Sequence, residues 1–247
     1  SSDLAAALGL ITATGTLAWN FLRPAPLPEV MRFEIHAPTG SRLPVGTPAI
    51  TNDGRMLAYT VTGPDGVTRI HVRSIDSTES RALPGTENAV HPFWSPDGRS
   101  LAFSETGQLK LIDLAAGAPR ALTAMAGPWQ GSWSQLGVIA FPMGGSLTRI
   151  SPAGGEAAKI LTADQRRGEL GIGHPYFLSD GKRFLVNVRR ADGNNSIELV
   201  SPETMERKLV LDQAESAPIV TRTPSGLPYL LYLRGASLAA QEFNETS

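Results

Sequence analysis

The strongest constraint on the fold is a sequence motif that returns about every 42 residues, a period typical of repeat architectures. Its clearest copy runs from His91 to Phe103 and reads HPFWSPDGRSLAF. Related copies begin at Thr47, Gln130, His174 and Thr223. The best copies centre on an Asp-Gly step, which forms a tight turn because glycine takes positive φ readily and aspartate tolerates it. The motif therefore predicts a β-hairpin in every repeat.

Each repeat carries two further strand-like segments after this hairpin. Residues 109–113 read LKLID, and residues 120–123 read RALT after a glycine-containing turn. Such β-rich runs bounded by turn residues are typical of short strands. A single four-stranded sheet cannot bury both of its faces, but radial stacking lets each sheet cover its neighbour. We therefore expect an all-β fold, a β-propeller of about five four-stranded blades, with a β-sandwich as the alternative.

The propeller is expected to occupy residues 31–247. Its blades should fall at about residues 47–89, 90–127, 128–172, 173–216 and 217–247. The fifth copy stops near its third strand. Two interpretations follow: a ring truncated from six or more blades, or a small ring closed by an outer strand from residues 32–37.

The N-terminal segment has a different character. Residues 4–22 form a stretch of 19 residues without a charge, which as a helix would be roughly 28 Å long, about the thickness of a bilayer core. Trp19 and Arg23 suit an interfacial anchor. We expect a transmembrane helix within residues 1–22 and a stiff proline-rich linker at residues 23–30. A signal peptide and a buried soluble helix are the alternatives.

The composition excludes several kinds of chemistry. The net charge is −1 and no basic stripe is present, so nucleic acid is not an expected partner. Cysteine is absent, which excludes disulfides, thiolate metal sites and a cysteine nucleophile. The sequence has no G-x-S-x-G and no H-E-x-x-H, and its four histidines are widely separated. We therefore expect no catalytic residue, no metal site and no cofactor.

Four residues hold the same phase in successive repeats. In each repeat, one residue is followed directly by the turn glycine, and each of the four lies six positions before that residue. They are Thr47, His91, Gln130 and His174. Equivalent positions in a propeller are related by rotation about its axis. We predict that these four residues line one mouth of the central channel, where they would form a candidate binding site for a small ligand or ion. The alternative is that His-Pro merely begins a strand.

Eight other repeat residues are expected to have structural roles. Turn positions account for six of them, and the two tryptophans should pack between blades rather than offer a ligand platform. These residues are Asp53, Gly54, Trp94, Asp97, Gly98, Trp133, Asp180 and Gly181.

The motif resembles the TolB-type, WD40-like propeller repeat, most fully over residues 93–103. The wider arrangement resembles one group, the bacterial membrane-bound serine/threonine protein kinases with an extracytoplasmic propeller. Segments that carry this resemblance are residues 32–36 (RFEIH), 83–87 (LPGTE), 131–133 (GSW), 151–156 (SPAGGE) and 237–243 (SLAAQEF). The resemblance implies a kinase domain upstream in the cytoplasm and a propeller on the outer side of a bacterial membrane.

What the resemblance implies for this chain is a non-catalytic sensing or protein-interaction module. The chain has no glycine-rich loop followed by a strand lysine, no H-R-D and no D-F-G, so we do not expect it to be an enzyme. Two alternatives remain. One is a TolB-like periplasmic scaffold without a kinase, and the other is the propeller gate of a peptidase of the prolyl oligopeptidase type. The ligand or partner has no signature in the sequence.

Overall fold

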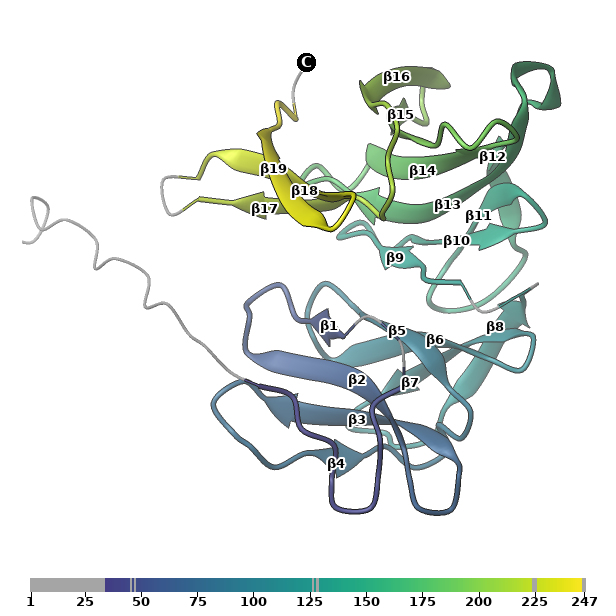
Figure 1. Ribbon diagram of the computed structural model, residues 1–247. Coiled ribbons are helices and arrows are strands. Elements are labelled where there is room, and N and C mark those ends of the chain that lie inside the picture. The colour runs from purple at the N-terminus through teal and green to yellow at the C-terminus, as the bar shows by residue number, and fades with distance from the viewer. Residues whose placement is uncertain are drawn as a thin grey trace, which may run out of the picture. The chain divides into compact units, whose positions relative to one another are not determined.

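The computed structural model describes residues 34–44, 46, 48–125, 127, 129–223 and 226–245 (Figure 1). The chain divides into residues 1–32 and a second compact unit, residues 33–247. The predicted transmembrane helix and the proline-rich linker lie outside the described residues. Among the residues that are described, no helix is long and apolar enough to cross a membrane.

The second unit is a five-bladed β-propeller, which confirms the predicted all-β fold. Apart from one short 3-10 helix, η1 (Gln165–Arg167), the regular elements among its described residues are strands. Within each blade, neighbouring strands are antiparallel and follow one another in chain order.

The blades are named A to E in chain order. Blade A contains β1 (Ala49–Ile50), β2 (Met56–Thr62), β3 (Thr68–Ser74) and β4 (Arg81–Ala82). Blade B contains β5 (Val90–Trp94), β6 (Ser100–Glu105), β7 (Gln108–Asp113) and β8 (Arg120–Ala124). Blade C contains β9 (Ser132–Trp133), β10 (Ile139–Met143), β11 (Ser146–Ile150) and β12 (Ala158–Thr162). Blade D contains β13 (Glu169–Phe177), β14 (Phe184–Arg190), β15 (Ser196–Ser201) and β16 (Glu206–Leu211). The described part of blade E contains β17 (Ile219–Arg222), β18 (Pro228–Arg234) and β19 (Ser237–Glu242).

The turn between the first and second strands has the same chemistry in blades A and B. In blade B the Ser95 hydroxyl donates to Asp97 Oδ1 at 2.6 Å, and the Arg99 backbone N–H donates to the same oxygen at 3.1 Å. Gly98 follows at φ 68°, a left-handed conformation that favours glycine. All these groups lie within six residues, so the turn is specified locally.

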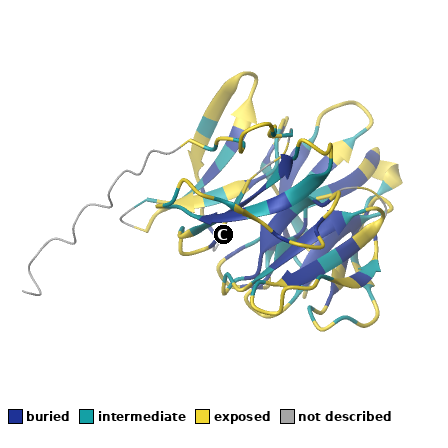
Figure 2. Cartoon of the chain, turned by 90° about the horizontal axis from the view of Figure 1, so that it is seen from below, coloured by how far each residue is buried: buried dark blue, intermediate teal, exposed yellow. Residues whose placement is uncertain are grey.

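Apolar residues fill the spaces between successive blades. Separate buried clusters join blade A to B, B to C, C to D and D to E. Figure 2 shows buried residues along the strands and exposed residues in the connecting loops. First strands of neighbouring blades also contact one another, β1 with β5, β5 with β9 and β9 with β13. The first strands are therefore the inner strands of the propeller.

The two terminal blades differ in how their outer faces are covered. On blade A, Ile35 packs on Leu57, Tyr59 and Val61, and the Glu34 carbonyl accepts a hydrogen bond from Arg73 Nη2 at 3.2 Å. The described part of residues 32–37 therefore covers blade A and does not extend blade E. On blade E, the register places Ile219, Leu233 and Leu238 on one face, and these side chains are exposed.

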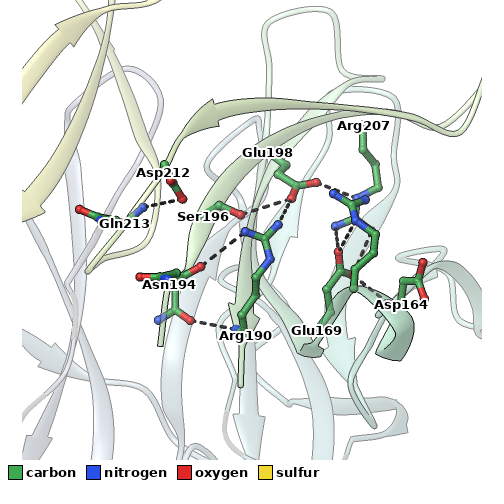
Figure 3. Close-up of polar contacts among 11 residues, drawn as sticks. Asp164, Glu169, Arg190, Asn194, Ser196, Glu198, Arg207, Asp212 and Gln213 are labelled. Carbon is green, nitrogen blue, oxygen red and sulfur yellow. Dashed lines mark hydrogen bonds and ion pairs between the residues drawn. The ribbon is translucent and has the colours of Figure 1, made fainter. Parts of the chain in front are cut away.

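A buried ion-pair network holds blade D together (Figure 3). Arg207 on β16 donates two hydrogen bonds to the carboxylate of Glu169 on β13, at 2.8 and 3.0 Å, and a third to Glu198 on β15 at 2.8 Å. Arg190 on β14 binds the other oxygen of Glu198 at 2.9 Å. Because each charge has an opposite partner, all four strands of blade D are linked at this end. The ion pairs anchor the start of β13, the strand that also carries His174.

Candidate functional site

His91 and His174 occupy the same unusual backbone position in two different blades. In β5, His91 and Pro92 together lie opposite Phe103, because the register shifts between Val90 and Phe93. In β13, the register shifts in the same way between Gly173 and Tyr176. Each histidine is thus part of a β-bulge, a feature that commonly redirects a side chain next to a functional site.

Both bulges hold their histidine in the left-handed region. The φ angle is 51° at His91 and 48° at His174. A residue other than glycine is uncommon there, and such strain persists only where the surrounding structure enforces it. The sequence predicted that the two histidines share a phase, but it contained no signal for the bulge or for the positive φ.

The two imidazoles lie close enough to interact electrostatically. Burial lowers the pKa of His91. Burial lowers the pKa of His174 as well, and the neighbouring charge of His91 lowers it further. Nδ1 of His174 is buried and has no hydrogen-bond partner. The charge of one predicted channel residue, His91, therefore acts on another, His174, and one buried nitrogen of His174 has no hydrogen-bond partner.

The other positions of the ring are more varied. Gln130 is half-buried and lies two residues before β9, the inner strand between β5 and β13. Thr47 lies outside the described residues. Ile219 holds the equivalent position in blade E, six residues before Ser225, and the sequence analysis missed it although the same counting rule would have found it. No group of three or more metal-ligating His, Asp or Glu residues occurs in the described part of the chain.

The predicted turn residues lie in the turns between first and second strands. Hydrogen bonds from Thr51 and then from the Arg55 backbone hold the pKa of Asp53 below its usual value. Ser95 and then the Arg99 backbone do the same for Asp97. At Asp180, burial alone would raise the pKa, but hydrogen bonds from Arg183 and Lys182 outweigh it and lower the pKa. Gly54 and Gly181 both have positive φ, at 71° and 69°. These groups are therefore engaged in turns.

The two tryptophans lie in the packing between blades. Trp94 is 8% exposed and belongs to the cluster that joins blades A and B. Trp133 is half-buried against the cluster between blades B and C. Neither indole forms an open platform for a ligand.

A separate cavity lies on blade A, where the sequence analysis had placed no site. Its volume is about 420 Å³, and Val61, Arg69 and His71 are among the residues that line it. Arg69 is bound to Asp65 at 2.9 Å and to Glu87 at 3.2 Å, and His71 Nδ1 lies 3.0 Å from Ser80 Oγ. Arg69, Asp65 and His71 at this cavity are therefore already paired within blade A.

The radial stack of antiparallel blades around the first strands has the TolB-like β-propeller fold. TolB from Acinetobacter baumannii is similar with a TM-score of 0.65 and 15% identity, over 81% of this chain and 52% of that chain. The putative TolB from Agrobacterium tumefaciens gives 0.60 and 16%, over 81% and 76%. The β-propeller domain of the Trilobed protease from Pyrococcus furiosus gives 0.52 and 16%, over 81% and 66%.

These similarities establish the fold. The chain spans about half the length of the Acinetobacter baumannii TolB. No family model and no curated protein sequence matches the chain.

Proposed function

We propose that this chain is a non-catalytic sensing or protein-interaction propeller, the extracytoplasmic domain of a bacterial membrane-bound serine/threonine protein kinase. The observation that carries the sensing role is that His91 and His174 hold the same position in two blades, each in the left-handed region at a bulge in an inner strand. A free buried nitrogen at that place supports a ligand site at the channel. The kinase context is supported by the sequence resemblance and by the TolB-like fold.

The proposed arrangement has residues 4–22 in the membrane and the propeller outside the cytoplasm. A ligand at the channel mouth, or a protein docked there, would then be detected on the outer side. The chain contributes no kinase chemistry of its own, because none of the kinase motifs occurs in its sequence.

The coding sequence upstream of Ser1 provides the first test. A glycine-rich loop followed by a strand lysine, then H-R-D and D-F-G, would support the proposal, and a coding sequence without these motifs would overturn it.

Membrane topology provides the second test of the proposal. Protease added to intact spheroplasts should cleave the propeller, and the cytoplasmic portion should be cleaved only after lysis. Protection of the propeller in intact spheroplasts would contradict the extracytoplasmic assignment.

A second candidate is the propeller of a peptidase. Two structures with this fold support it, the Trilobed protease propeller and puromycin hydrolase, the latter with a TM-score of 0.51, 18% identity and coverage of 76% of this chain and 33% of that chain. A G-x-S-x-G motif in the coding sequence downstream of Ser247 would favour this candidate over the kinase.

A further inference from the structure

We propose that His91 and His174 together bind a small oxyanion, the carboxylate or tetrahedral oxyanion group of a ligand, at the channel mouth of the propeller. The inference rests on the proposed sensing role, because it names the chemical class of ligand for that same site.

The backbone at the two histidines indicates a built site. The same bulge and nearly the same φ recur in blades B and D, although the intervening blade C has Gln130 and Gly131 at the two positions. A left-handed residue other than glycine costs free energy, and a proline that follows restricts its conformation further. Two matching bulges therefore point to a shared requirement on where these imidazoles lie.

The polar groups at the site match an anion better than a metal ion. Burial is the only influence that lowers the pKa of His91, and His91 is the only charged neighbour that acts on His174. No carboxylate therefore acts on either ring among the described residues. A divalent cation would find two imidazoles without a third ligand from a His, Asp or Glu side chain in that part of the chain. Protonated imidazoles, in contrast, offer only donors, and the Gln130 amide is a further donor at the same ring of positions.

An oxyanion would supply the counter-charge that the pair lacks. Protonation of the two rings is disfavoured, because burial lowers the pKa of both histidines and the neighbouring charge of His91 lowers the pKa of His174 further. A bound anion reverses this balance by forming charge-assisted hydrogen bonds to the protonated rings. Binding should therefore take up protons, strengthen as the pH falls toward the histidine pKa range and weaken as the pH rises.

The test is isothermal titration calorimetry of the whole chain with acetate and, separately, with sulfate, at about pH 5.5 and about pH 8. Acetate represents a carboxylate source and sulfate a tetrahedral oxyanion, so the two titrations distinguish the sources. We expect one site per chain and an affinity at least about tenfold higher at the lower pH. His91→Gln and His174→Gln should each weaken binding by about tenfold or more. His71→Gln is the matched control, because His71 is half-buried in blade A and hydrogen-bonded to Ser80. This substitution should leave anion binding unchanged.

Three results would overturn the inference. The first is the absence of acetate and sulfate binding at the lower pH. The second is equal affinity in the wild type and in folded His91→Gln and His174→Gln variants, with folding checked by circular dichroism. The third is stoichiometric Zn²⁺ binding that both substitutions abolish while neither anion binds.

The result of this experiment can be distinguished from the result of the kinase test. Kinase motifs upstream without anion binding would contradict only this inference. Anion binding without those motifs would contradict only the kinase assignment.

Discussion

The indole Nε1 of Trp94 donates a hydrogen bond of 3.1 Å to the backbone carbonyl oxygen of Ala49, which belongs to the preceding blade. The donor lies on β5 and the acceptor on β1, so one side chain connects two inner strands that are 45 residues apart. The same ring packs in the apolar cluster between blades A and B. Trp94 therefore contributes both apolar burial and a hydrogen bond to this blade interface.

Trp94→Ala should lower the free energy of unfolding by about 3–5 kcal/mol, as truncation of a large buried aromatic residue does. Trp94→Phe should cost less, because it retains most of the buried ring area and loses the hydrogen bond to Ala49. Urea unfolding followed by circular dichroism measures both. Leu238→Ala is the control, since Leu238 is 70% exposed. A loss below about 1 kcal/mol in Trp94→Ala would mean that the indole is not an interface residue.

Arg207→Met should destabilise the chain by about 3–5 kcal/mol, because it leaves the buried carboxylates of Glu169 and Glu198 without their main partner. Lys182→Met is the matched control. Lys182 also pairs with a glutamate, Glu203, but both side chains are largely exposed, and the loss of unfolding free energy should be much smaller than for Arg207→Met. Equal losses of unfolding free energy for the two substitutions, measured by urea unfolding, would contradict the prediction that the buried ion pairs stabilise the fold more than the exposed pair.

Acid should weaken the fold partly through Glu169. Burial alone would raise the pKa of Glu169, but hydrogen bonds from Arg207 and the Asp164 backbone outweigh it, so the folded pKa is lowered. The resulting stabilisation is present above the unfolded pKa, about 4.3, and is lost as the pH falls through the lower folded pKa. Glu169→Gln should therefore reduce the fall in unfolding free energy below about pH 4.3. The fall should not vanish, because the pKa values of Asp53 and Asp97 are also lowered. If the unfolding free energy of Glu169→Gln falls with pH as steeply as that of the wild type, Glu169 does not contribute to the acid sensitivity.

Removal of residues 1–29 should leave a folded, all-β protein. The five apolar clusters of the described residues use only side chains between Ile35 and Phe243. The packing among these described side chains should persist without residues 1–29, so the truncated chain should remain soluble, with a β-type circular dichroism spectrum and a cooperative thermal transition. Failure of this chain to fold would show that residues 1–29 form part of the core.

The sequence determined the repeat and the chemistry of its turns. Ser95, Asp97 and Gly98 form their hydrogen bonds and left-handed turn within six residues of one another, so the motif itself is sufficient to predict the hairpin. The five-bladed architecture followed from the regular spacing of such hairpins. The equal phase of His91 and His174 was visible for the same reason.

Tertiary structure decided what those in-phase residues do. His91 on blade B and His174 on blade D can interact only because blade C sets the distance and angle between these two blades. That geometry depends on two apolar interfaces, one between blades B and C and one between blades C and D. The bulges depend on pairing with β6 and β14, and the Arg207 network joins residues that are 38 positions apart. None of these contacts has a local sequence signal, because each arises only when separate strands pack together.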